Sequence, residues 1–256
     1  MSEAAVEVTG VEKVFGRGSA EEVTALSGVD LTVQPGEFVT LIGSSGCGKS
    51  TFLRLIGNLL EPTAGLVTVF GKSAYQARLD QDYGMVFQHA GLFDWRKVAG
   101  NIELPLELKG WSKADRAARS REMLDLVKLP DFGGHYPRQL SGGMQQRVSI
   151  ARALINEPSI VLADEPTGNL DSRTSVEVMD IFQALNTDRG ITILLITHEQ
   201  AIAEYGSRIV GFRDGRIVAD NQTKTRRIAR DEMAALPLDL DVEPANQPSE
   251  TTTIGT

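Results

Sequence analysis

The stretch that decides the fold is "GSSGCGKST", residues 43–51. An apolar run, "FVTLI" at 38–42, precedes it and has the length of a buried strand. A helical pattern follows it, with apolar residues on one face from Phe52 to Leu59. A strand, a glycine-rich loop and a helix in this order fit the pattern G-x-x-x-x-G-K-[ST], which cradles nucleotide phosphates. The sequence therefore predicts an α/β domain that binds a nucleotide.

Each kind of residue in this loop has a physical task. Its glycines let the backbone turn tightly, so that N–H groups and the N-terminus of the next helix face the β- and γ-phosphates. Lys49 adds a positive charge, and Ser50 offers a hydroxyl to Mg²⁺. We therefore expect ATP with Mg²⁺ as the ligand. The residues expected to bind it here are Gly43, Ser44, Ser45, Gly46, Cys47, Gly48, Lys49, Ser50 and Thr51.

Segments outside this phosphate loop (residues 43–51) predict the class of fold. Apolar runs at 84–87, 160–163 and 191–197 alternate with helical patterns, which is typical of a doubly wound, mostly parallel sheet. Before residue 38, alternating polar and apolar residues predict a smaller antiparallel β subdomain. The stretch from 90 to about 150 predicts a helical subdomain.

Polar residues stand where the predicted strands end. Asp164 and Glu165 end the run that begins at 160, Gln88 follows the run at 84–87, and a histidine, His198, follows the last run. Ligands bind beyond the carboxyl ends of parallel strands, so we expect these side chains to converge on the phosphate loop. Asp164, like Gln88 and the serine of the loop, is a candidate Mg²⁺ ligand. Glu165 is a candidate for polarising the attacking water, and His198 for donating a hydrogen bond to the transferred phosphate.

A second glycine-rich stretch, "LSGGMQQR" at 140–147, follows no predicted strand, so the same rule does not bring it into this site. It still has the properties of an anion site. Ser141 can cap the helix that follows, while Gly142 and Gly143 permit close approach to its free N–H groups. A second phosphate site remote from the first suggests contact with the ATP of another copy of the chain.

Together these motifs resemble the nucleotide-binding subunits of ABC transporters, and the resemblance covers about residues 6–220. It matches the phosphate loop to Walker A, Gln88 to the Q-loop, residues 140–147 to the signature motif, "IVLADEP" to Walker B with its catalytic glutamate, "NLD" at 169–171 to the D-loop, and His198 to the switch histidine. Six motifs in the family's order leave little room for chance.

The resemblance implies a head-to-tail dimer of two copies. Each ATP would lie between the phosphate loop of one copy and the signature segment (residues 140–147) of the other. The signature residues implied to bind the nucleotide are Ser141, Gly142, Gly143 and Gln145. Phe15 matches the aromatic residue that stacks on adenine in the family.

The resemblance also implies a membrane partner. Residues 88–101 would receive the coupling helix of a permease, with Leu92, Phe93 and Trp95 as an apolar groove. The first two thirds of the chain are similar to the ATPases of nitrate, sulfonate and taurine importers, whose systems can include a substrate-binding protein. The part after Walker B is closer to lipoprotein-releasing and macrolide-export ATPases. We favour an importer of small anions or nutrients, and release or export and a non-transport ABC ATPase stay open as alternatives.

Charge and composition exclude other classes. The formal net charge of −8 argues against nucleic acid as a partner, because such binding depends on Lys and Arg neutralising phosphates. No run approaches the roughly 18 apolar residues of a membrane span, so we expect a cytoplasmic position at the membrane face, held through the permease.

The C-terminal segment differs from the rest. We assign residues 1–225 to the ATPase domain and residues 226–256 to an extension. From Ala229 to Thr256 there are six acidic residues against one basic residue, so this stretch supplies five of the eight excess negative charges. After about Pro237 no periodicity remains, and we expect disorder there.

Overall fold

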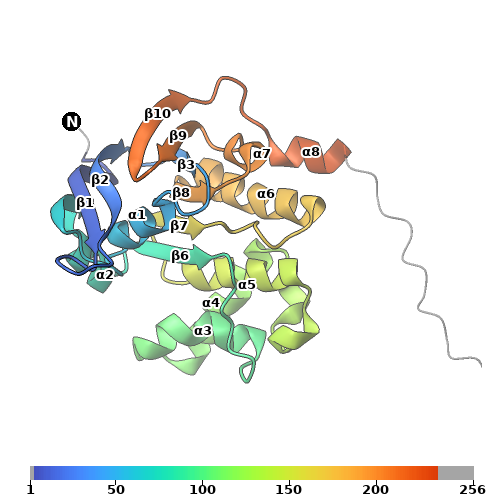
Figure 1. Cartoon of the computed structure of the whole chain (residues 1–256). Coiled ribbons are helices and arrows are strands. Elements are labelled where there is room, and N and C mark those ends of the chain that lie inside the picture. Colours follow the sequence, from blue (N-terminus) through green and yellow to red (C-terminus); the bar gives the residue numbers. More distant parts are fainter. Residues whose placement is uncertain (1–2, 236–256) are drawn as a thin grey trace, which may run out of the picture.

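A six-stranded sheet forms the centre of the computed structural model, which describes residues 3–235 (Figure 1). The predicted disorder beyond Pro237 lies outside the described residues. The strand order across the sheet is β10-β9-β3-β8-β7-β6, and all neighbouring pairs are parallel except β10 with β9. The strands are β3 (Phe38–Ile42), β6 (Tyr83–Phe87), β7 (Ile160–Asp164), β8 (Thr192–Thr197), β9 (Arg208–Arg213) and β10 (Arg216–Gln222). The predicted parallel sheet is confirmed.

Both faces of this sheet are buried. Val39 and Leu41 of β3 pack on the side of helix α1 (Lys49–Ile56), whereas Phe38 faces the other side. There it joins the apolar side chains of α5 (Gly142–Leu154) and α6 (Ser172–Arg189). Successive strand residues point to opposite faces, so a continuous apolar run such as 193–196 of β8 supplies both cores at once.

The antiparallel β subdomain is confirmed as a second sheet with strand order β2-β1-β4-β5. Its strands are β1 (Val6–Phe15), β2 (Val23–Val33), β4 (Ala64–Val69) and β5 (Lys72–Ser73), and the short helix α2 (Ala74–Asp80) follows them. The apolar residues of this sheet share one core with α1 and with one face of the parallel sheet. The second sheet thereby lies beside the start of α1.

Helices fill the segment between β6 and β7. They are α3 (Val98–Leu108), α4 (Lys113–Leu126), the short 3-10 turns η1 (Pro130–Phe132) and η2 (Pro137–Gln139), and α5. Ser112 caps α4 by accepting a hydrogen bond from the N–H of Asp115, as the spacing predicts. A Cβ at Gly84 of β6 would come within 2.3 Å of the Ala153 carbonyl, so α5 lies directly against the sheet. The predicted helical segment thus ends in a helix that belongs equally to the central core.

The C-terminal elements close the described fold. After α7 (Gln200–Ala203), strands β9 and β10 meet at Asp214 and Gly215, whose φ values of 49° and 73° suit a tight hairpin. Helix α8 (Ala229–Ala235) then packs along α6, where Gln183 accepts a hydrogen bond from the Ala229 N–H at 2.9 Å. Among residues 3–235 we find no helix with both the length and the apolar composition that a bilayer crossing requires.

One local prediction is wrong. Helix α1 stops at Ile56 instead of extending to Leu59. The N–H of Gly57 closes the last turn on the Leu53 carbonyl, and Asn58 then turns the chain with a φ of 44°. Leu59 is consequently exposed and does not share the buried face of the helix.

Candidate nucleotide-binding site

The four adjacent strands β3, β8, β7 and β6 all end at one cavity of about 540 Å³. The phosphate loop follows β3, His198 follows β8, Asp164 ends β7, and Gln88 follows β6. The lining residues are Ala25, Ser45, Gly46, Gly48, Lys49, Ser50, Thr51, Arg54, Gln88, Asp164, Glu165 and His198. The parallel register therefore brings together side chains that are more than 100 residues apart in the sequence.

The backbone of the phosphate loop turns at glycines. Gly46 and Gly48 have φ values of 78° and 105°, in the region that favours glycine. A Cβ at Gly48 would also lie 2.6 Å from the Ala25 carbonyl, so the loop can sit against β2 only without a side chain there. Gly48 precedes α1 without a side-chain cap, which leaves N–H groups of the first turn available to an anion.

Lys49 is bound by its own loop. Its Nζ donates to the carbonyls of Gly43 at 2.6 Å and Ser44 at 2.9 Å, and the residue is only 4% exposed. Gly43, Ser44 and Cys47 are not among the lining residues: Ser44 is exposed, Gly43 is half-buried and Cys47 is buried, and their nucleotide contacts stay a prediction. A Cβ at Gly43 would meet the Phe212 carbonyl at 2.3 Å and the sulfur of Cys47 at 2.8 Å, so Gly43 lies directly against strand β9 and Cys47.

Ser50 and Asp164 form the oxygen pair that suits a divalent cation. The Ser50 hydroxyl donates to Asp164 Oδ1 at 2.8 Å, and Asp164 is nearly buried. No group of three or more His, Cys, Asp and Glu side chains suited to a metal occurs in the described part of the chain. Mg²⁺ in phosphate-transfer sites typically takes only one or two protein ligands, and phosphate and water oxygens complete its shell. The pair therefore fits a nucleotide-borne Mg²⁺.

Glu165 and His198 are in direct contact. His198 Nδ1 lies 2.9 Å from Glu165 Oε2, and because a carboxylate only accepts, this nitrogen is the donor. Glu165 adopts a φ of 48°, an uncommon conformation for a residue with a side chain, directly after the last residue of β7. Its N–H donates to the Ile196 carbonyl of the neighbouring strand at 3.0 Å. This strained turn holds the carboxylate at the cavity.

Gln88 links the cavity to the segment after Walker B. Its Nε2 donates to Asn169 Oδ1 at 3.4 Å, and Asn169 Nδ2 lies 3.1 Å from His89 Nδ1. A Cβ at Gly168 would be 3.0 Å from the Gln88 amide, so this glycine allows the two segments to lie together. Sequence reasoning did not single out Asn169 as a partner of Gln88.

Two further lining residues were missed, and the predicted adenine contact is not in the lining. Ala25 enters from β2, and Arg54 from α1. Arg54 could have been found from helical spacing, because it follows Ser50 by four residues and thus shares its face. Phe15, the predicted adenine contact, lies outside the lining; it is 40% exposed at the end of β1, opposite Val23 of β2. The nitrogen of Lys13 lies 5.1 Å from the centre of its ring.

A family model described as ABC transporter matches residues 26–168, which is more than half of the chain. The chain belongs to the ABC transporter family. In family terms, the cavity brings together Walker A, Walker B, the Q-loop and the switch histidine. Its fold class and its nature as an ATPase cassette agree with the prediction from sequence.

Relatives of this ABC cassette have different transport roles. It is 46% identical to a methionine import ATP-binding protein of Corynebacterium efficiens, over 83% of this chain and 61% of that protein. It is 43% identical to an uncharacterized ABC transporter ATP-binding protein of Methanocaldococcus jannaschii, over 83% of this chain and 97% of that protein. It is 40% identical to a macrolide export ATP-binding/permease protein of Rhodopseudomonas palustris, over 90% of this chain and 36% of that protein. The chain thus spans about three fifths of the methionine import protein and about a third of the macrolide export protein.

Solved structures agree with the fold. A dimeric ATP-binding cassette in a post-hydrolysis state, bound to ADP and phosphate, matches with a TM-score of 0.77 at 38% identity, covering 86% of this chain and 99% of that one. A dimeric bacterial ABC transporter cassette matches with a TM-score of 0.78 at the same identity and coverage. These relatives are dimers, which is the assembly that the signature segment predicts.

The signature segment lies outside the nucleotide cavity. Ser141 caps α5 by accepting from the Met144 N–H at 3.3 Å. Gly142 and Gln145 line a separate hollow of about 310 Å³, which shares only Gln88 with the nucleotide cavity. The amide of Gln145 donates to two backbone carbonyls of its own chain, so here Gln145 braces the turn instead of pointing outward. Nucleotide contacts by this segment stay a prediction.

Proposed function

We propose that this ABC cassette hydrolyses Mg²⁺-ATP between two head-to-tail copies and thereby powers a membrane transporter. The observation that supports this most is the convergence of six loop residues, two acids, one glutamine and one histidine at a single sheet edge. Phosphoryl transfer needs positioning and neutralisation of charge more than covalent chemistry, and these residue types supply both.

Within the site, each side chain has a distinct role. Ser50 and Asp164 would hold Mg²⁺, which neutralises charge on the phosphates when bound. Lys49 would leave the loop carbonyls that it contacts now and bind the β- and γ-phosphates, since it can reach them from the same buried position. Glu165 would orient the attacking water by accepting its proton, and this is why a carboxylate stands at a strained turn facing the cavity.

His198 orients that carboxylate. As a neutral ring it donates from Nδ1 to Glu165 and presents Nε2 as an acceptor. The sequence predicts that His198 donates a hydrogen bond to a γ-phosphate. For that, the ring must either carry a second proton or give up its hydrogen bond to Glu165. Our proposal is that the histidine positions the base first and contacts the phosphate only after nucleotide binding rearranges the pair.

The same proposal includes a permease that docks on residues 88–101. This segment is held firmly: buried Asn101 bonds the backbone of Phe93, and Arg152 donates to the carbonyls of Ala90 and Gly91. Trp95 is nevertheless 75% exposed and contacts the Phe93 ring, with ring centres 4.8 Å apart. A rigid loop that presents an exposed tryptophan suits a partner helix, because such residues dominate interface energetics.

The transport direction follows from no residue of the cassette. Methionine importers and a macrolide exporter are both among its relatives. We retain import of a small nutrient, with a substrate-binding protein, as the first hypothesis, and export or lipoprotein release as the second. The nitrate, sulfonate and taurine class rests only on the sequence resemblance.

The deciding experiment measures hydrolysis and assembly together. We expect the full chain to hydrolyse ATP only with Mg²⁺, and Lys49→Ala to abolish both nucleotide binding and ATP-dependent dimers in light scattering. Trp95→Ala serves as the matched control: it should bind ATP normally and fail only to join the permease. A Lys49→Ala protein with normal turnover would contradict the proposal.

A further inference from the structure

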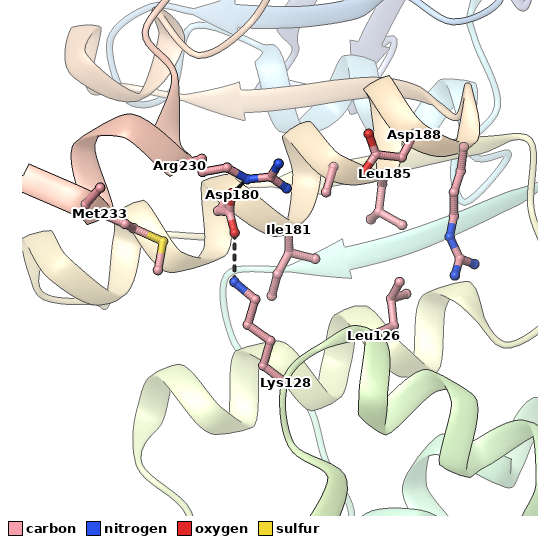
Figure 2. Close-up of a pocket in the computed structure, with 11 residues that line it drawn as sticks. Leu126, Lys128, Asp180, Ile181, Leu185, Asp188, Arg230 and Met233 are labelled. Carbon is pink, nitrogen blue, oxygen red and sulfur yellow. Dashed lines mark hydrogen bonds and ion pairs between the residues drawn. The ribbon is translucent and has the colours of Figure 1, made fainter.

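A pocket of about 380 Å³ lies away from the nucleotide cavity, where the end of α4, helix α6 and helix α8 meet (Figure 2). Leu126 points toward it from α4, Ile181 and Leu185 from α6, and Met233 from α8. Leu126 and Met233 are only partly buried although they pack against the main core. The walls are therefore apolar and incompletely covered.

Charged residues of both signs line this α6–α8 groove, with Lys128, Arg189 and Arg230 against Asp180 and Asp188. Lys128 and Arg230 both face Asp180, with nitrogen–oxygen distances of 2.8 Å and 4.0 Å (Figure 2). Asp180 is almost buried, whereas the Lys128 and Arg230 side chains are 56% and 76% exposed. One carboxylate thus lies between two cations that remain open to solvent. A bound segment whose carboxylates face the solvent-exposed sides of Lys128 and Arg230 would give each cation a second negative partner.

The chain itself leaves the described structure at this groove. Met233 and Ala234 line the pocket, and α8 ends at Ala235. Pro237 cannot continue a helix, and it disfavours the helical conformation at Leu236. From the sequence we therefore expect the chain after Ala235 to favour an extended conformation.

The sequence after α8 matches the groove in pattern and in charge. Residues 236–242 read "LPLDLDV", with Leu or Val at every second position and Asp239 and Asp241 between them. In an extended chain, alternate side chains point to opposite sides, so the apolar side chains face one way and the carboxylates the other. Seven extended residues reach up to about 25 Å. The stretch of α6 from Asp180 to Arg189 is only about 14 Å long at the helical rise.

We propose that residues 236–242 of the chain's own acidic tail lie along the α6–α8 groove. The leucines fill the apolar pocket, and the two aspartates face Lys128 and Arg230. Because Lys128 lies in the turn after α4, the tail straps the helical subdomain to α6 and α8 of the central core. The expectation that no periodicity remains after Pro237 is thus corrected: residues 236–242 alternate, and only the Pro-, Ser- and Thr-rich residues that follow lack a period.

Amide hydrogen exchange of the full chain tests this strap. We expect residues 236–242 to exchange at least about tenfold more slowly than residues 250–256 of the same tail. Ala184→Phe, which places a ring in the pocket from a half-buried helix position, should remove this protection. The paired change Leu238→Ser and Leu240→Ser should remove it as well, and it cannot disturb the core because it lies in the tail.

A charge control separates the contribution of the aspartates from that of the leucines. Asp239→Lys with Asp241→Lys should reduce the protection, whereas Glu243→Lys with Glu250→Lys changes the net charge equally and should leave it intact. Equal exchange along the whole tail would refute the strap. Protection that increases with protein concentration would also refute it, because the groove would then hold the tail of a second copy. ATP hydrolysis enters none of these measurements, so the result is independent of the proposed function.

Discussion

The phosphate loop and the signature segment both precede the N-terminus of a helix, but they differ in what surrounds that terminus. At α1, Gly48 leaves the first turn without a side-chain cap, and the ends of three other strands deliver acids, an amide and an imidazole to the same cavity. At α5, Ser141 already caps the helix, and the adjoining hollow is lined by His89 and by amide and apolar side chains, with no carboxylate and no lysine. We call the first region the complete region, and we propose that the second is a half site that contacts the nucleotide of another copy.

This difference teaches how an assembly is encoded in a single chain. A helix start that combines Ser141, Gly142 and Gly143 is suited to bind an anion, but the fold keeps it away from the nucleotide cavity of its own chain. Gly143 is also constrained from behind, because a Cβ there would approach the Thr174 side chain to 2.1 Å. We propose that the missing half comes from the nucleotide-loaded site of another copy.

The largest expected effect concerns the complete region. Glu165→Gln keeps the shape of the side chain but cannot accept the proton of the attacking water, so hydrolysis should fall by about 10²-fold or more. ATP affinity should stay normal, and an ATP-bound dimer should accumulate. Turnover by the purified transporter complex and light scattering measure the two outcomes. Unchanged turnover would remove Glu165 from the catalytic role.

A matched pair at Ser141 tests the half site. Asp and Asn have nearly the same size and both cap helices well, so Ser141→Asp and Ser141→Asn should keep α5 intact. Only the aspartate would place a carboxylate against the γ-phosphate of a partner. Like charges about 4 Å apart cost about 1 kcal/mol in water and more at a protein surface. We therefore expect ATP-driven dimerisation of Ser141→Asp to weaken by about tenfold.

The measurement for these two variants is the ATP concentration at which half of the protein is dimeric. Nucleotide affinity of the monomer is the control, and neither substitution should change it. Identical behaviour of the two variants would mean that Ser141 is a helix cap and nothing more.

A smaller effect is expected at the edge of the complete region. Phe15 lies outside the cavity lining, and Lys13 contacts its ring. Stacking of a base on an aromatic residue contributes about 1–3 kcal/mol. We expect the low end here, so Phe15→Ala should weaken ATP binding about fivefold, whereas Phe15→Tyr should not. A purine-specific loss, with no change for a pyrimidine triphosphate, would place the adenine against this ring.

The smallest effect concerns the contact between the turn after α7 and helix α8. Tyr205, in the turn after α7, donates to Glu232 at 2.6 Å, and Arg227 pairs with the same carboxylate. The hydrogen bond from Arg227 is the main reason that the pKa of Glu232 is lowered. A lowered pKa stabilises the fold at neutral pH, and this stabilisation is lost as the pH falls through the folded-state pKa.

Glu232→Gln should therefore have a lower melting temperature at pH 7, and it should lose less on acidification to pH 3 than the parent chain does. Thermal denaturation at the two pH values measures the difference. Parallel losses in both proteins would mean that Glu232 contributes nothing to acid sensitivity.

Much of the complete region could be predicted from sequence because its rules are local. The order of strand, glycine loop and helix follows from residues 38–56, and parallel strands bring their carboxyl ends to one edge whatever connects them. This rule predicts that one edge of the sheet holds Asp164, Glu165, Gln88 and His198, although it says nothing about their contacts. Arg54 was missed although helical spacing could have found it.

What the sequence determined by itself is chemistry and class: a phosphate loop, a pair of acids at a strand end, and a second helix start that follows no strand. Only the tertiary structure decided which partners those residues have, namely that Glu165 contacts His198, that Gln88 contacts Asn169, and that Gln145 faces its own backbone. It also decided that Gly43 packs against Phe212 and Cys47 and is not part of the cavity lining. The reason is physical: periodicity and motif spacing describe neighbours along the chain, whereas these contacts depend on how separate strands and helices pack, and no local pattern records that packing.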